Sequence, residues 1–207
     1  NVAMAMGATA GGLKLYSAYP MSPASSILTW FMSHGERVGV AVKQAEDEIA
    51  VANMTIGAGH VGVRAMCATS GGGFALMTEA IGMASIIEAP AVFINVMRGG
   101  PSTGLPTKTE QGDLNQAFGA SQGDYPRVIV APADIPDCYY MTAEALNIAE
   151  QFQLPVIILS DLLLGQHVET LATDVLTPDV PIKRGEILDE VAATEMNGRF
   201  KRYAFTP

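Results

Sequence analysis

Six short apolar runs, each separated from the next by a stretch of helical character, constrain the fold of this chain more than any other feature. Short apolar runs bounded by turn residues are typical of buried strands, and their alternation with helices is typical of a parallel sheet. The sequence therefore predicts an α/β domain, a six-stranded parallel sheet with helices on both faces. The predicted strands are residues 13–18, 38–43, 63–68, 91–97, 128–131 and 155–160.

Helical stretches lie between these runs, and some carry recognisable end signals. Ser22 before Pro23 is a favourable helix start, since a hydroxyl can cap free N–H groups and proline fits the first turn. His34-Gly35 is a typical helix end. After Gly165 the chain becomes irregular, which predicts one domain over 1–165 and an irregular tail or linker over 166–207. The predicted helices are residues 2–12, 24–33, 46–56, 74–87, 110–118 and 134–152.

Composition narrows the possible partners. Hydrophobic residues make up 49% of the 207 residues and charged residues 16%, and a mean hydropathy of +0.25 is high for a soluble monomer. No run reaches the roughly 18 apolar residues that span a bilayer, so we expect the excess apolar surface to be buried against a partner and not in a membrane. The net charge of −9, without any Lys/Arg-rich segment, argues against nucleic acid as the main ligand. No signal peptide is visible, although the chain begins at Asn1, and the cytoplasm is the expected compartment.

The cysteines and histidines predict neither a disulfide framework nor a metal site on this chain. Cys67 and Cys138 each lie in an apolar stretch, and we expect both to be buried free thiols. His34, His60 and His167 are far apart and lack the spacing of metal ligands. Satisfied or surface histidines are the better interpretation.

The loops that follow the strands should carry the function, because ligands of parallel sheets lie outside the carboxyl ends of the strands. One such loop opens a helix with three acids in residues 44–50, QAEDEIA. Acids in a first helical turn are usually solvated, where the helix dipole favours them. Apolar residues follow Glu48 at once, however, so one of these acids could point inward. A buried carboxylate can hold or pass a proton near neutral pH.

A second loop begins at Arg98 and continues with glycines and hydroxyl residues through 98–109. A lone arginine after an apolar strand is usually a surface residue. Here the backbone amides of the loop could line a pocket, and a guanidinium in that place suits bidentate capture of a carboxylate. From the residues alone, both interpretations stay open.

A third loop, residues 70–73 (SGGG), could approach a ligand closely or could simply make a tight strand-to-helix turn. No G-x-G-x-x-G or Walker sequence occurs, which argues against a dinucleotide or nucleoside triphosphate. The turn also imitates the nucleophile elbow of a serine hydrolase, and Ser70, Asp161 and His167 follow in hydrolase order. Asp161 and His167 are only six residues apart, which is close for groups that separate loops normally carry.

Four segments occur in order along the chain: residues 19–25 (YPMSPAS), 44–50 (QAEDEIA), 68–71 (ATSG) and 98–107 (RGGPSTGLPT). Together they resemble the α subunits of 2-oxoacid:ferredoxin oxidoreductases, most closely the 2-oxoglutarate type. The resemblance runs from Val2 to about Pro207. It implies the pyrimidine-binding domain of a thiamine diphosphate enzyme.

By this resemblance Glu48 is the catalytic carboxylate, which bonds N1′ of the aminopyrimidine and so promotes deprotonation of the thiazolium C2. Ser22 and Arg98 would bind the substrate, with Arg98 holding its carboxylate, while Ser70 and Gly71 would contact the cofactor. Ser22 departs from the family, whose members commonly carry threonine there. The implied reaction is oxidative decarboxylation of a 2-oxo acid, with electrons passing through iron–sulfur clusters to ferredoxin and the acyl group passing to coenzyme A.

The resemblance also implies a β subunit. In this family the cofactor's diphosphate is held through Mg2+ by a Gly-Asp-Gly motif, and cysteines hold the iron–sulfur clusters. Residues 112–114 (GDL) and 123–125 (GDY) lack the second glycine, and the two cysteines form no cluster. We therefore expect thiamine diphosphate to be shared with a β subunit that carries Mg2+ and [4Fe–4S].

Several alternatives stay open at this point. 2-Oxoglutarate is the first choice of substrate, but pyruvate and branched-chain 2-oxo acids share the same motifs, and reductive carboxylation would use the same residues. Relatives continue beyond the position of Pro207 into another domain, so we expect a fragment or one segment of a longer polypeptide. A non-catalytic domain that kept the fold is a further alternative, in which Glu48 or Arg98 would have no ligand to meet.

Overall fold

The computed structural model describes residues 1–205 and contains a six-stranded sheet in which every pairing is parallel. The order of the strands is β2-β1-β3-β4-β6-β5. The predicted α/β architecture is therefore confirmed. The strands are β1 (Leu15–Ala18), β2 (Ala41–Gln44), β3 (Ala65–Thr69), β4 (Ala91–Met97), β5 (Val128–Val130) and β6 (Pro155–Asp161).

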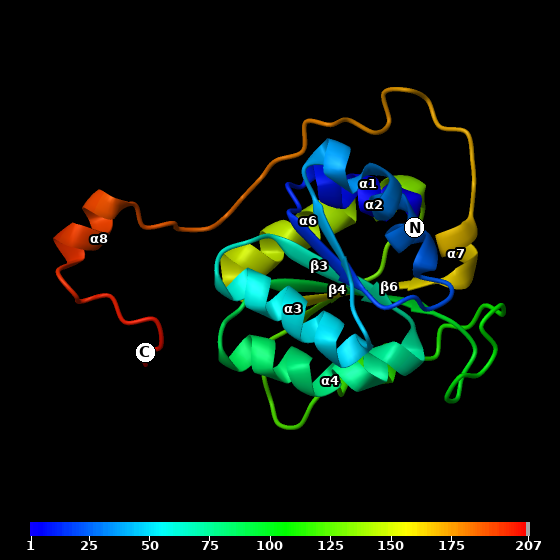
Figure 1. The fold of residues 1–207 in the computed structure, drawn as a ribbon, viewed down its shortest axis with the longest axis horizontal. Coiled ribbons are helices and arrows are strands. Elements are labelled where there is room, and N and C mark those ends of the chain that lie inside the picture. Colours follow the sequence, from blue (N-terminus) through cyan, green and yellow to red (C-terminus); the bar gives the residue numbers. More distant parts are fainter. Residues whose placement is uncertain (206–207) are drawn as a thin grey trace.

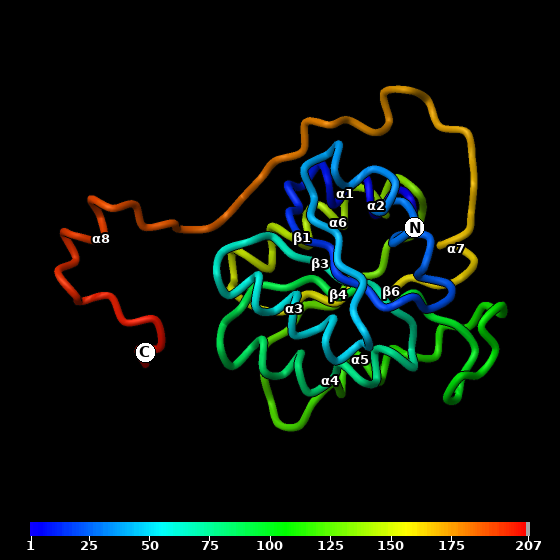
Figure 2. The backbone as a smooth tube through the Cα atoms, viewed as in Figure 1, coloured from blue at the N-terminus to red at the C-terminus, as the bar shows by residue number. Residues whose placement is uncertain are grey.

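Helices cover both faces of the sheet (Figure 1). Helices α1 (Val2–Ala10), α2 (Ser25–Val38) and α6 (Ile135–Phe152) contribute their buried side chains to one core, and α3 (Glu48–His60), α4 (Gly71–Ile86) and α5 (Leu114–Phe118) to the other. Helix α7 (Leu162–Gln166) follows β6 directly, and α8 (Glu190–Met196) lies in the tail. The smooth backbone trace in Figure 2 shows that β1, β3, β4 and β6 run between these two layers.

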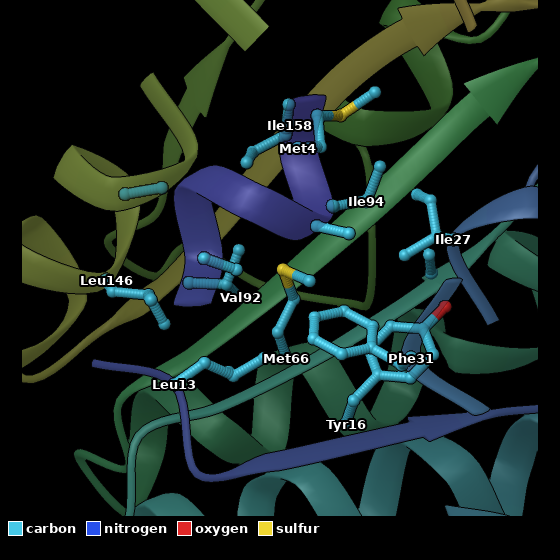
Figure 3. Packing of buried hydrophobic residues seen from close by; sticks show 14 of the residues in the cluster. Met4, Leu13, Tyr16, Ile27, Phe31, Met66, Val92, Ile94, Leu146 and Ile158 are labelled. Carbon is cyan, nitrogen blue, oxygen red and sulfur yellow. The ribbon is translucent and has the colours of Figure 1, made fainter. Parts of the chain in front are cut away.

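The two central strands are buried along their whole length, so their side chains alternate between the two cores. On one face Met66 and Val92 pack with Tyr16 and Phe31, whose rings stack at a centroid distance of 4.6 Å (Figure 3). On the other face Phe93 packs against α3 and α4. Burial of each such side chain contributes about 1.5–3 kcal/mol, so β3 and β4 form the rigid base on which the loops stand.

The second strand differs from the prediction of a buried strand over 38–43. Helix α2 continues to Val38, and β2 begins only at Ala41 as an edge strand whose side chains are mostly exposed. Gly35 lies inside the helix and does not end it. A Cβ at this position would lie 2.6 Å from Val42 Cγ2, so the close packing of α2 against β2 accounts for the glycine. The helix ends at Gly39, whose φ of 71° is left-handed.

Several helix starts also differ from the prediction: α3 begins at Glu48 and α4 at Gly71, where 46 and 74 were expected. Helix α2 begins at Ser25 with Ala24 at its N-cap and no capping side chain, so Ser22 is not its cap. The helix expected over 110–118 begins only at Leu114, because the preceding residues belong to the long loop after β4.

The segment predicted as irregular, 166–207, passes over the surface of the domain, contains α8, and ends with residues 206–207 outside the described part (Figure 1). A buried ion pair anchors it: Arg64 Nε donates to Glu150 Oε2 at 2.8 Å, and both side chains are nearly inaccessible. Arg184 from the segment donates to the other oxygen of Glu150 at 2.6 Å. Hydrogen bonding to Glu150 raises the pKa of Arg184 above its ordinary value. One carboxylate therefore binds β3, α6 and the tail together.

We expect Glu150→Ala to destabilise the fold by about 3–5 kcal/mol, because it leaves the buried Arg64 guanidinium without its counter-charge. Urea unfolding of the purified chain would measure this loss. Glu144→Ala is the matched control: its ion pair with Lys183 is 3.8 Å long and about half exposed, so its effect should stay below about 1 kcal/mol. Equal effects of the two substitutions would contradict the anchoring role.

Candidate functional site at the carboxyl edge of the sheet

The chain diverges at the carboxyl ends of β1 and β3, which are neighbours in the sheet. After β1 it passes to α2 on one face, and after β3 it passes to α4 on the other. Such a point of divergence opens a crevice, where ligands of doubly wound sheets bind. Met21 and Thr69 lie on its two sides, and the Thr69 hydroxyl is 3.7 Å from Met21 Sδ.

Glu48 is the first residue of α3, and its carboxylate points inward. Asp47 is the N-cap, and its Oδ1 accepts from Ala50 N at 2.8 Å, which fixes the start of the helix. Glu46 is exposed, whereas Glu48 is only 3% exposed, so the three neighbouring acids have three different environments. Glu48 Oε1 is buried and has no hydrogen-bond partner within residues 1–205. A buried acceptor without a partner is costly, so it indicates a group supplied from outside this part of the chain.

The first turn of α4 makes room for this carboxylate. A Cβ on Gly73 would lie 2.6 Å from Glu48 Oε1 and would overlap Thr69 Oγ1. The side chains of Glu48 and Thr69 therefore occupy the space that a larger residue would take at position 73. Gly71, on the opposite side of the same turn, faces Asp113, whose Oδ2 would be 2.6 Å from a Cβ there.

Arg98 follows β4 at the same edge and is only 9% exposed. Its Nη1 donates to the carbonyl oxygen of Ser22 at 2.5 Å, and its Nη2 donates to that of Thr103 at 2.9 Å. The structure therefore brings Ser22 and Arg98 together, through the backbone of Ser22, while the Ser22 side chain is exposed. A guanidinium carries five N–H donors, so these two bonds leave donors available for a ligand.

A cavity of about 500 Å³ opens between these loops. Arg98 and Asp113 are its charged members, and the glycines 71 and 72 of α4 bring backbone close to it. Glu48 lies beyond the first turn of α4, on the side of Gly73. The cavity is lined by Met21, Gly71, Gly72, Ala75, Arg98, Gly99, Gly100, Pro101, Ser102, Thr103, Asp113 and Gln116.

The sequence prediction missed Asn95 and Asp113. Asn95 lies fully buried in β4 and donates through Nδ2 to Asp113 Oδ2 at 2.9 Å, while its Oδ1 has no partner within the described residues. A buried amide in an otherwise apolar strand was the available signal. Asp113 was considered only as part of an incomplete Gly-Asp-Gly motif, and its position beside Gly71 depends on the long loop after β4.

The residues of the hydrolase alternative do not form a triad. Asp161 accepts from Gln111 Nε2 at 2.6 Å and caps α7 by accepting from Leu164 N at 2.9 Å. His167 is exposed and faces Glu169 at 3.3 Å. Ser70 Oγ is buried without a partner in the described part of the chain, so it has no base to activate it.

Three further results bear on the predictions. Cys67 and Cys138 are free and buried, as predicted. Within residues 1–205, no three His, Cys, Asp or Glu side chains form a group that could hold a metal ion. No helix in that part of the chain is long and apolar enough to cross a membrane.

We expect neither thiol to react with iodoacetamide in the native chain at pH 8. Burial raises the pKa of Cys67 to about 12 and that of Cys138 to about 11, and the reactive form is the thiolate. Mass spectrometry before and after unfolding in guanidinium would measure the labelling. Rapid labelling of the folded chain would contradict the burial of these residues.

The fold and the cavity define a doubly wound α/β domain. The inward Glu48 carboxylate and the Arg98 guanidinium lie at the carboxyl ends of its strands. Residues 6–196 match the family model described as "Pyruvate flavodoxin/ferredoxin oxidoreductase, thiamine diP-bdg". The chain therefore belongs to this family as its thiamine diphosphate-binding domain, and the resemblance to 2-oxoacid:ferredoxin oxidoreductase α subunits is confirmed.

Individual relatives agree with this assignment. The chain is 47% identical over 172 residues to the 2-oxoglutarate synthase subunit KorA of Archaeoglobus fulgidus, covering 83% of this chain and 50% of that one. It is 42% identical over 213 residues to 2-oxoacid:ferredoxin oxidoreductase 1, subunit alpha, of Aeropyrum pernix, covering 98% of this chain and 32% of the relative.

A solved structure gives the same result. It is the 2-oxoglutarate:ferredoxin oxidoreductase of Magnetococcus marinus, with 2-oxoglutarate, coenzyme A and succinyl-CoA bound. It matches with a TM-score of 0.88 at 41% identity, over 99% of this chain and 34% of that chain. The chain thus spans about a third to a half of the length of the relatives described here.

Proposed function

We propose that this chain supplies the pyrimidine half of a thiamine diphosphate site in a 2-oxoacid:ferredoxin oxidoreductase that decarboxylates a 2-oxo acid oxidatively to acyl-CoA. The observation that carries the proposal is the Glu48 carboxylate, which is buried at the carboxyl edge of the sheet and lacks a partner in the described chain. The family match and the names of the relatives support the reaction class.

The residues present fit this cofactor. Glu48 Oε1 is an unpaired oxygen that would share a proton with N1′ of the aminopyrimidine, and Gly73 leaves the space in which the carboxylate lies. Ser70 and Gly71 stand at the start of α4, where a ring or its substituents can come close to the backbone. When bound, thiamine diphosphate would supply a nucleophilic carbon for the 2-oxo group and a cationic ring that takes up the electron pair left behind when CO2 departs.

Glu48 would hold and move the proton at N1′. Its hydrogen bond strengthens in a site from which water is excluded. Such an exchange of a proton between two fixed groups requires that the carboxylate keep one orientation, and the Asp47 cap fixes the start of the helix from which Glu48 extends.

Arg98 and Ser22 would bind the 2-oxo acid. The Arg98 guanidinium lines the cavity and is already fixed by two carbonyl groups, so its free N–H donors are oriented before a carboxylate arrives. We take 2-oxoglutarate as the first substrate to test, because two of the relatives described here are named for it. Pyruvate and branched-chain 2-oxo acids are the other members of the assay panel.

A β subunit is the partner we propose, with Mg2+ and [4Fe–4S] on that subunit and with coenzyme A and ferredoxin as further reactants. The relatives are named as subunits, which supports a complex. Helices α3 and α4 also carry apolar side chains on their outer surfaces, and exposed apolar surface of this kind is typical of an interface. These side chains are Ile49, Leu76 and Ile86, and Val61 follows directly after α3.

We also propose that residues 1–165 form the pyrimidine-binding domain and that 166–207 connect it to a further domain. The greater length of the relatives supports a further domain. The cytoplasm, where coenzyme A and ferredoxin meet, is the compartment we propose.

Glu48→Gln should lower the decarboxylation rate of the complete enzyme by a factor on the order of 10² to 10⁴, because the amide cannot exchange a proton with N1′. Viologen reduction with 2-oxoglutarate, coenzyme A and thiamine diphosphate would measure it. Glu46→Gln makes the same charge change at an exposed position and should leave the rate unchanged. A fully active Glu48→Gln enzyme would overturn the proposed function.

Arg98→Lys should raise the KM for the 2-oxo acid by roughly 10- to 100-fold, because an ammonium cannot make the paired donors of a guanidinium. Steady-state kinetics of the complete enzyme over the substrate panel would separate KM from kcat. Arg37→Lys, at an exposed position near the end of α2, is the control. An unchanged KM would remove Arg98 from the substrate site.

A further inference from the structure

Two residues beside Glu48, Thr69 and Gly73, carry an inference that rests on the proposed function and extends it. We infer that they are positioning residues that fix the Glu48 carboxylate in the orientation in which it meets the cofactor ring. Gly73 provides the space, and the Thr69 hydroxyl provides a hydrogen-bond donor.

The argument for Gly73 is steric. It lies in the first turn of α4 and is buried. A Cβ there would lie 2.6 Å from Glu48 Oε1 and 2.7 Å from Glu48 Cγ. Distances this short mean that an alanine would displace the carboxylate, together with the Thr69 hydroxyl, which the added Cβ would overlap.

The neighbouring glycines make this argument specific. Three consecutive glycines begin α4, although glycine is a poor helix former by about 1 kcal/mol relative to alanine. Gly72 would place a Cβ no closer than 3.7 Å to Ser102 O, so a methyl group fits there. Of positions 72 and 73, only position 73 must be glycine to leave room for the Glu48 side chain.

The argument for Thr69 concerns an unused donor. Its side chain is 1% exposed, yet its hydroxyl has only long contacts, 3.7 Å to Met21 Sδ and 3.5 Å to Ser70 O. A Cβ on Gly73 would contact both Thr69 Oγ1 and Glu48 Oε1, so these two oxygen atoms lie near one another. Glu48 Oε1 has no hydrogen-bond partner within residues 1–205. A weakly bonded donor thus lies beside an unpaired acceptor, and a small rearrangement on cofactor binding satisfies both groups.

A purely structural role for Thr69 makes a different prediction. If Thr69 served only as a β-branched residue of a buried strand, its replacement by valine would change neither the stability of the fold nor the affinity for the cofactor. The hydroxyl makes no short bond in the described chain, so Thr69→Val should fold as stably as the native protein. Any loss of cofactor affinity would then report on the hydroxyl itself.

The decisive measurement is the dissociation constant of thiamine diphosphate, obtained by calorimetric titration of the complete apo-enzyme with the cofactor in the presence of Mg2+. We expect Thr69→Val to raise it by roughly 10-fold and to lower kcat by roughly 10- to 100-fold, as for the loss of one hydrogen bond to a charged group. The KM for the 2-oxo acid should change little. Thr69→Ser, which keeps the hydroxyl, should restore both values, and native cofactor affinity and kcat in Thr69→Val would overturn the role of Thr69.

Gly73→Ala tests the steric half of the inference. We expect its cofactor affinity and kcat to fall at least as far as those of Thr69→Val. Gly57→Ala, at a helical position in α3 with no atom within 4 Å of the added Cβ, should change neither value. Native affinity in Gly73→Ala would overturn the role of Gly73; where that variant fails to fold, the comparison of Thr69→Val with Thr69→Ser still decides whether Glu48 is positioned.

The outcome for Glu48→Gln separates the two proposals. If that variant is inactive while Thr69→Val behaves as the native enzyme, the positioning inference fails and the proposed function stands. If Glu48→Gln retains full activity, the proposed function fails and takes the inference with it.

Discussion

The burial of the Glu48 carboxylate is the interaction on which the rest of the site depends, because the groups around it must make room for a charge and compensate for its lost hydration. Removing an ionised group from water costs several kcal/mol unless other charges or dipoles compensate for it. Glu48 has no counter-ion in the described chain, but it begins α3, where the helix dipole favours negative charge by about 0.3–1 kcal/mol. The first turn of α4 lies beside the carboxylate, at Gly73. The helix dipole therefore offsets only part of the cost of burying Glu48. This agrees with the proposal that the carboxylate binds a cofactor.

A second carboxylate shows the same arrangement on the other side of α4. Residues two positions apart in a helix point about 200° apart, so Gly71 faces Asp113 while Gly73 faces Glu48. A polar side chain of the sheet lies near each acid, Asn95 for Asp113 and Thr69 for Glu48, and these two residues pair across β3 and β4. The glycines at positions 71 and 73 are therefore explained by the two carboxylates that lie against them, and not by the backbone conformation of the turn.

Much of this arrangement could be predicted from the sequence, because strand–helix alternation fixes which loops share an edge of the sheet. Glu48 and Arg98 were expected at that edge for this reason, and the structure has both of them there, buried. The second strand was misplaced because Gly35 looked like a helix end, whereas its small size serves packing against Val42. Asp113 and Asn95 could not be paired, since they lie eighteen positions apart, largely across an irregular loop. The tail anchor was equally hidden, because Arg64, Glu150 and Arg184 are distant in sequence and become neighbours only in the folded chain.

Arg98 holds the loop after β1 and the loop after β4 through one guanidinium. Both loops are thus ordered in the free chain, and little conformational entropy is left to lose when an acid enters. Under the proposed function, Arg98 would anchor the carboxylate that all 2-oxo acids share, whatever the remainder of the molecule. Discrimination among 2-oxo acids would then come from how well their variable ends fit the opposite wall of the cavity, which the proposed partner subunit would complete.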